Sequence, residues 1–326
     1  MKEIFNKLAK QTVLIIGDVM IDSYLWGNVD RISPEAPVPI LSVTKRENRL
    51  GGAANVALNI LAMGAKPIIC SVIGNDGHAT TFDSLLNDQN ISNAGIIKSD
   101  NRVTTVKTRL IGHHQQMLRV DSEVIKDITK TETEQLIGKV AQIIDIEKVD
   151  AIIFEDYDKG VITHKLIEEI VELAQERNIP TIVDPKKKNF LHYKNVTLFK
   201  PNLKELREGL KVDIDAKDHH QLVDAIELLK HKLNASMVMV TLSEQGIYIN
   251  SAEEKMLIPA HIRDISDVSG AGDTVVSVAA LGLAAGLKPS QFTALANLAG
   301  GLVCEKLGVV PVDKMQLLEE AKKHKI

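Results

Sequence analysis

The sequence predicts an α/β fold in which helices cover both faces of a mostly parallel sheet and a small β lid stands beside it. Short runs of β-branched and other apolar residues alternate with longer amphipathic segments, the pattern of parallel strands connected by helices. Two segments, at about 22–49 and 101–121, break this alternation. The 326 residues are 44% hydrophobic and 25% charged, which is enough for a single domain over 1–326.

The strands of the main sheet are expected where apolar residues would line both faces, at 13–17, 68–73, 151–154, 180–184 and 238–241. Helices are expected where apolar residues recur at helical spacing, at 53–63, 131–144, 164–177 and 219–233. Ligands of such sheets bind beyond the carboxyl ends of the strands. The chemistry should therefore follow the strands directly, at Asp18, Glu155-Asp156, Asp184-Pro-Lys186 and Asn202.

The two segments that break the pattern predict the lid. The Pro-rich residues 32–40 cannot form a helix interior or a central strand, and residues 101–121 alternate in the manner of strands. We expect both to pair into a small sheet that covers a substrate site and excludes water. Apolar residues at 38–40 and 103–110 would leave one face of that sheet uncovered, so a homodimer formed through the lid is expected.

Composition excludes several classes of partner. The net charge of −4 gives no electrostatic reason to expect nucleic acid or an anionic membrane. No apolar run is long enough to span a bilayer, and the first residues lack a signal-peptide pattern. Cys70 and Cys304 lack the spacing of a metal site and are expected to be reduced thiols. A cytoplasmic enzyme is the expectation.

The motif Gly270-Ala-Gly-Asp273-Thr, followed by an apolar segment, predicts an anion site at the start of a helix. The backbone N–H groups of Gly270, Ala271 and Gly272 would hold a phosphoryl group. A carboxylate among them makes sense as the base that takes a proton from an attacking hydroxyl. We therefore predict Asp273 to be the catalytic base. The structural alternative is a tight strand-to-helix turn with an Asp near the helix start.

An N-terminal group of residues predicts contacts to sugar hydroxyls. Gly51 and Gly52 let the backbone approach a ligand closely, and Asn55 offers both a donor and an acceptor. Asp18 and Asp22 are candidates for gripping neighbouring hydroxyls. The alternatives are a helix start packed on the sheet and carboxylates that cap a helix.

Asn202 and Glu205 are three residues apart and share a face at a predicted helix start. Because Mg²⁺ favours few protein oxygens and keeps its waters, this pair is suited to hold it beside phosphates through water. The alternative is an N-cap with a capping-box Glu. The sequence has no G-x-x-x-x-G-K-[ST] loop, which excludes a P-loop enzyme.

Together these motifs resemble the ribokinase-like carbohydrate kinases of the PfkB family. Gly51-Gly-Ala-Ala-Asn55 is similar to the family's N-terminal signature, and Asp267-Val-Ser-Gly-Ala-Gly-Asp273 to its C-terminal one. The resemblance covers essentially the whole chain and implies ATP and Mg²⁺ as cofactors. It also implies Asp273 as the base and Asn202 with Glu205 in the Mg²⁺–phosphate region. The remaining implied roles are nucleotide contacts at Thr241, Ser243, Gly246, Asp267 and Asn297, and sugar contacts at Asp18, Asp22, Gly51, Gly52 and Asn55.

Within the family, segments such as 17–22, 31–39 and 156–160 are most similar to kinases of D-glycero-β-D-manno-heptose 7-phosphate. This implies phosphorylation of the anomeric hydroxyl to heptose 1,7-bisphosphate, in the ADP-heptose route to lipopolysaccharide. In many bacteria such kinases are fused to a nucleotidyltransferase domain; this chain ends at Ile326, so a separate nucleotidyltransferase is expected. Val309 stands where the family usually has a hydroxyl residue, which leaves a monovalent-cation site near Asp267 open.

A sugar phosphate would need nearby cations, because the protein and ATP are both negative. Alternation places Lys107 and Arg109 on one face of a lid strand. With Lys186 at a strand end they form the predicted pocket for the 7-phosphate, and Arg119 is a further candidate. Each could instead be a surface charge.

Three other functions remain open at this point. The first is a kinase of the same scaffold for another sugar or a nucleoside. The second is a nicotinamide-dependent oxidoreductase, although no G-x-G-x-x-G follows the first predicted strand. The third is a catalytically silent sugar sensor, which would have no need of Asp273 and its anion site.

Overall fold

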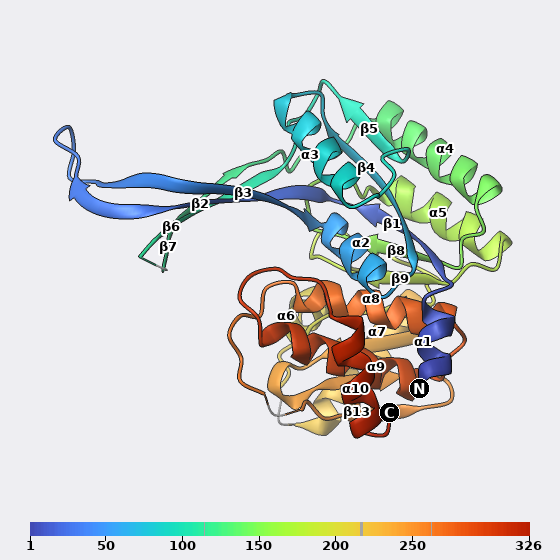
Figure 1. The fold of residues 1–326 in the computed structure, drawn as a ribbon. Helices are drawn as coiled ribbons and strands as arrows, with labels where there is room; N and C mark the ends of the chain where they lie inside the picture. Colours follow the sequence, from blue (N-terminus) through green and yellow to red (C-terminus); the bar gives the residue numbers. More distant parts are fainter. Residues whose placement is uncertain (114, 216–217, 262) are drawn as a thin grey trace.

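A nine-stranded sheet forms the centre of the computed structural model, which describes residues 1–113, 115–215, 218–261 and 263–326 (Figure 1). All its strand pairs are parallel except β11–β12 and β12–β13. The strand order is β13 (Lys255–Ile258), β12 (Ile247–Asn250), β11 (Met237–Thr241), β10 (Leu198–Phe199), β9 (Thr181–Asp184), β8 (Ala151–Glu155), β1 (Thr12–Gly17), β4 (Lys66–Gly74), β5 (Ile96–Ser99).

Helices cover both faces of this sheet because its strands are apolar on both. In β1, Val13 and Ile15 pack into one core while Leu14 and Ile16 pack into the other. The first core is covered by α1 (Lys2–Leu8), α2 (Ala53–Ala62), α3 (Gly77–Asp88), α8 (Ala271–Ala284), α9 (Pro289–Cys304) and α10 (Lys314–Lys323). The second is covered by α4 (Lys130–Ile146), α5 (His164–Glu176), α6 (Leu203–Leu210) and α7 (His219–Leu233). The predicted fold class is confirmed.

A second, four-stranded sheet lies beside the first and projects from the body as a long ribbon (Figure 1). Its order is β3 (Pro39–Gly52), β2 (Val19–Ile32), β6 (Val106–Gly112), β7 (Gln115–Ser122). Most of these strands come from the two segments that broke the sequence pattern, at about 22–49 and 101–121, and β2, β3 and β7 extend up to three residues beyond those bounds. Residue 114 of the second segment lies outside the described residues. Of the two long strands, β2 begins directly after Asp18 and β3 runs through Gly51 and Gly52, so the lid strands start and end beside the main sheet.

Gly52 sets the direction in which the chain leaves the lid. Its φ of 59° lies in the left-handed region, and a side chain there would clash with the backbone oxygen of Asp18. The turn at Gly52 starts α2 at Ala53 and carries Asn55 to the carboxyl end of the main sheet. No helix of the described residues is both long and apolar enough to cross a membrane.

Candidate active site

Asp273 lies in the first turn of α8. This helix begins directly after Gly270, whose φ of 80° lies in the left-handed region. The first amides of a helix have no carbonyl partner within it, and they lie at the positive end of the helix dipole. Of the three amides predicted to hold an anion, that of Ala271 donates to the carbonyl of Val268 at 3.3 Å. The amides of Gly270 and Gly272 are the other two, and neither residue has a side chain that would block access to its amide. A helix start of this kind can hold a phosphoryl group.

The Asp273 carboxylate is buried and held by a donor on each oxygen. Asn55 Nδ2 donates to Oδ2 at 2.6 Å, and the Tyr157 hydroxyl donates to Oδ1 at 2.8 Å. Burial raises the pKa of Asp273 to about 6, although both donors lower it and Asp184 adds to the increase. A carboxylate with this pKa is largely ionised at neutral pH and is a stronger base than an exposed Asp.

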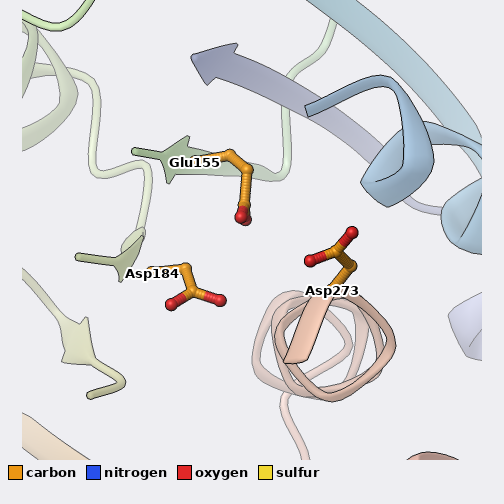
Figure 2. Close-up of side chains that lie close together, drawn as sticks. All are labelled: Glu155, Asp184 and Asp273. Atoms are coloured by element: carbon orange, nitrogen blue, oxygen red, sulfur yellow. The ribbon is translucent and has the colours of Figure 1, made fainter. Parts of the chain in front are cut away.

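Two further carboxylates, Glu155 from β8 and Asp184 from β9, face Asp273 (Figure 2). Oxygens of the three lie within 4.8 Å of one another. Lys200, itself buried, pairs with Asp184 Oδ2 at 2.9 Å and supplies a cation to the group. Burial, together with Asp184 and Asp273, raises the pKa of Glu155 well above its ordinary value, which favours its protonated form. Lys200 and protonation of Glu155 thus offset part of the negative charge of this cluster.

A cavity of about 130 Å³ opens beside Asp273 and reaches the lid sheet. Seven of the residues that line it were predicted from the sequence as site residues, namely Asp22, Gly52, Asn55, Lys107, Arg109, Gly270 and Asp273. Arg119, which was a further candidate, lines it as well. The remaining lining residues are Met20, Tyr157, Ser269 and Val309. The structure thus brings the predicted base and the predicted lid cations to one space.

The lid end of the cavity concentrates positive charge. Arg109 pairs directly with Asp22 and lies opposite Arg119 across the β6–β7 pair. Arg119 is bound to Asp121, while the side-chain ammonium of Lys107 has no hydrogen-bond or ion-pair partner within the part of the chain that the structure describes. Burial and the neighbouring Lys159 lower the pKa of Lys107. Asp22 and Asp121 offset the charges of the two arginines, so Lys107 is the cation of this group whose charge has no paired carboxylate among the described residues.

Two predicted sugar contacts lie elsewhere. The buried Asp18 carboxylate accepts the backbone N–H groups of Tyr157, Lys159 and Val161 at 2.9–3.1 Å, which fixes the loop after β8. Gly51 packs against Asp22, and a side chain at that position would clash with Asp22 Oδ2. The structure therefore gives Asp18 and Gly51 supporting positions around the cavity rather than places in its lining.

Lys186 is not among the residues that line this cavity. Its ammonium pairs with Glu205 Oε1 at 2.7 Å and lies 5.4 Å from the centroid of the Tyr157 ring. Burial lowers the pKa of Lys186, but Asp184 and Glu205 outweigh that effect and raise it overall. Of the three cations predicted to bind the 7-phosphate, the cavity lining contains Lys107 and Arg109, together with the further candidate Arg119.

Asn202 and Glu205 form a capping box at the start of α6. Asn202 Oδ1 accepts the amide of Glu205 at 2.8 Å, and Glu205 Oε2 accepts the amide of Asn202 at 2.9 Å. This is the structural alternative that the sequence left open. It does not conflict with a role toward a hydrated cation, because carboxylate and amide oxygens can each accept a further hydrogen bond.

The other predicted nucleotide contacts come from β11, the turn after it, α9 and the segment before α8. Thr241 ends β11 and bridges to Asn202, and the turn after it contains Ser243 and a left-handed Gly246 with φ of 101°. Asn297 on α9 donates to the carbonyl of Pro259 at 2.8 Å. Asp267 accepts the amides of Ser269 and Gly308 at 2.9 and 3.0 Å. All five lie outside the lining described for the cavity at Asp273.

Tyr157 and Lys200 were not predicted as site residues. Tyr157 follows the end of β8 by two residues, and Lys200 follows β10 directly. Both positions satisfy the rule that ligands bind beyond the carboxyl ends of parallel strands. Strand-end position is therefore the signal that would have included both, and Tyr157 also lies in the segment 156–160 that the resemblance singled out.

Comparisons with known proteins show the family of the chain. The family model described as pfkB family carbohydrate kinase matches residues 10–315. Bifunctional protein HldE of Aliarcobacter butzleri is 41% identical over 317 residues, which cover 97% of this chain and 66% of that protein. Bifunctional protein HldE of Helicobacter pylori is 38% identical over 296 residues, covering 91% and 63%. The chain thus spans about two thirds of the length of these relatives.

Solved structures show the same fold at low sequence identity. Phosphofructokinase-2 from Escherichia coli in complex with potassium superposes with a TM-score of 0.80 at 19% identity, over 97% of this chain and 100% of that one. Arabidopsis thaliana ribokinase complexed with ribose and ATP gives a TM-score of 0.72 at 15% identity, over 95% and 99%. With the family match across residues 10–315, the chain belongs to the pfkB family of carbohydrate kinases and is a sugar kinase.

Proposed function

We propose that this kinase transfers the γ-phosphoryl group of ATP to the anomeric hydroxyl of D-glycero-D-manno-heptose 7-phosphate, giving heptose 1,7-bisphosphate. Its sequence motifs resemble those of heptose 7-phosphate kinases, and its relatives include proteins named HldE. The observation that carries the proposal is that Asp273 and the lid cations Lys107, Arg109 and Arg119 line one cavity. A substrate with a hydroxyl at one end and a phosphate at the other fits that distribution of charge.

The roles of the residues follow from their chemistry. Asp273 takes the proton of the attacking hydroxyl, while Asn55 and Tyr157 keep its carboxylate in place. The amides at the start of α8 hold the transferring phosphoryl group. ATP with Mg²⁺ supplies that group, and Asn202 and Glu205 would hold the ion through water. Thr241, Ser243, Gly246, Asp267 and Asn297 would contact the nucleotide.

The sugar would lie between α2 and the lid. Asp22, Gly52 and Asn55 line its part of the cavity, with Asp18 and Gly51 behind them. Lys107, whose ammonium is partly buried without a partner among the described residues, would bind the 7-phosphate. Arg109 and Arg119 would join it, since they lie opposite each other on β6 and β7 in the lining of the same cavity, and Arg can bind a phosphate through two hydrogen bonds. A nucleotidyltransferase is the partner activity that we propose for a later step of the route.

A coupled ADP-release assay over several acceptors tests the substrate. We expect heptose 7-phosphate to give the highest kcat/KM among heptose 7-phosphate, fructose 6-phosphate, ribose and adenosine. Unphosphorylated heptose serves as the matched control, because it retains the hydroxyl and lacks the group that the lid cations would bind. Preference for ribose or adenosine would assign the chain to another branch of the family.

Replacing Asn202 or Glu205 by Ala should raise the Mg²⁺ concentration required for half-maximal rate and leave the KM for the sugar nearly unchanged. Each variant also removes part of the helix cap, which costs about 1 kcal/mol of stability. Thr163→Ala is the control, because it removes the N-cap of another helix, α5. In that cap the Leu166 amide donates to the Thr163 hydroxyl. A Mg²⁺ titration of both variants that superposes on that of the control would leave the pair with a capping role only.

We further propose that two copies of the chain pair through their lids. On β7, Arg119 faces the cavity, so by alternation Leu118 and Val120, which are 56% and 51% exposed, lie on the opposite face. Val38, the residue directly before β3, is also 51% exposed. Exposed apolar residues on a sheet that stands off the body favour a covering partner.

Sedimentation at micromolar concentration should show a dimer, and the double variant Leu118→Glu with Val120→Glu should sediment as a monomer. Burying an unpaired carboxylate at such an interface is strongly unfavourable. Ile146→Glu on α4, where Ile146 is 74% exposed, is the control and should remain dimeric. A monomeric wild-type chain would reject the proposal.

A further inference from the structure

Tyr157 is held in place from three sides. Its backbone N–H donates to Asp18 Oδ2 at 2.9 Å, and its ring lies under the Lys186 ammonium at 5.4 Å. Its hydroxyl donates to Asp273 Oδ1 at 2.8 Å. Lys186 is itself tied to Glu205 at the cap of α6. The side chain therefore has a defined position at the cavity, with its hydroxyl directed at one oxygen of one carboxylate.

The two donors on Asp273 divide its oxygens between them. Asn55 uses Oδ2 and Tyr157 uses Oδ1, so the plane of the carboxylate is fixed. Each carboxylate oxygen can accept two hydrogen bonds, so either oxygen can still receive the proton of a substrate hydroxyl. We propose that Tyr157 is a positioning residue that fixes the orientation of Asp273 and keeps it ionised for proton abstraction. The inference rests on the proposed role of Asp273 as the base.

Electrostatics around Asp273 show why such a donor is needed. Burial and Asp184 raise the pKa of Asp273, while Asn55 and Tyr157 lower it. Because a donor to the charged form lowers a pKa, loss of the Tyr157 hydroxyl should raise that of Asp273 further. Besides Tyr157 itself, the charged and titratable groups that face Asp273 or share its cavity are Glu155 from β8, Asp184 from β9, Lys200 after β10, and Asp22, Lys107, Arg109 and Arg119 from the lid. Tyr157→Phe removes the hydroxyl and keeps the ring beneath Lys186.

The test is a carbon-13 NMR titration of the full chain labelled at the Asp carboxyl carbons, which needs no substrate. The Asp273 resonance is identified by its absence in Asp273→Asn. In Tyr157→Phe we expect its titration midpoint to rise by roughly one pH unit, the size of one hydrogen bond to a charged group. The pH midpoint of the acid limb of the kcat/KM profile for heptose 7-phosphate should rise by the same amount, with little change in KM.

Tyr193→Phe is the matched control, because it removes the same kind of bond, from the Tyr193 hydroxyl to Asp156 at 2.7 Å. It should lower stability and leave the Asp273 midpoint unchanged. If Tyr157→Phe fails to fold, 3-fluorotyrosine at position 157 replaces it. Fluorine makes the hydroxyl a stronger donor, so the midpoint should then fall.

An Asp273 titration that is the same in Tyr157→Phe or fluorotyrosine protein as in wild type would overturn the inference. So would a shifted titration with an unchanged pH–rate profile. Failure of the proposed base is a different result: Asp273→Asn would retain wild-type turnover, whatever the titration in the Tyr157 variant shows.

Discussion

Asp273→Asn should lower turnover by roughly 10²–10⁴-fold, the usual contribution of a positioned base. An Asn amide keeps the size and polarity of the side chain but cannot accept the proton of the attacking hydroxyl. The KM for ATP should change little, because the carboxylate faces the cavity shared with the lid. Steady-state kinetics with heptose 7-phosphate measure the effect. Retention of more than about a third of wild-type turnover would show that another group is the base.

The loss should not result from unfolding. The pKa of Asp273 is raised from 3.8 to about 6 by burial in the folded state. The folded chain therefore binds this proton more tightly than the unfolded chain, and the associated stability is present below pH 3.8 and lost as pH rises through about 6. Above that pH the ionised carboxylate opposes folding. The neutral Asn variant removes this cost, which offsets the hydrogen bond that its amide nitrogen cannot accept, so we expect it to remain folded. Asp264→Asn, at an exposed residue, is the control.

Lys107→Ala should raise the KM for heptose 7-phosphate at least tenfold and leave the KM for ATP nearly unchanged. Tenfold corresponds to about 1.4 kcal/mol. A pair of unit charges at 4 Å near a protein surface interacts by about 4 kcal/mol at an effective dielectric constant of 20, so even a partly screened contact reaches this value. Unphosphorylated heptose should show no such change in KM.

Arg109→Ala should have a similar effect on KM but is less simple to interpret. It also leaves the buried Asp22 without its partner, which costs stability. Lys45→Ala is the control for both variants, because Lys45 lies on the lid strand β3, pairs with Glu47 and is 65% exposed. Normal sugar-phosphate KM values in both single variants would exclude the cationic pocket and the proposed substrate with it.

Local sequence was sufficient for the fold class and for the position of Asp273. The period of apolar residues predicted five strands and four helices of the main body, because a buried strand and an amphipathic helix must each repeat their apolar residues at a fixed spacing. Gly270 and Gly272 marked the start of α8 for a similar reason: the left-handed turn at Gly270 requires a residue without a side chain.

Which side chains meet was decided by the tertiary structure alone. Tyr157 and Asp273 are 116 residues apart in the sequence. They form a hydrogen bond because the neighbouring strands β8 and β9 both contact α8. The same strand order turns Asp18 toward the loop after β8 and Lys186 toward Glu205. The opposition of Arg109 and Arg119 depends on the β6–β7 register. Periodicity describes one element at a time, whereas these contacts depend on strand order and register, which arise only when the elements pack together.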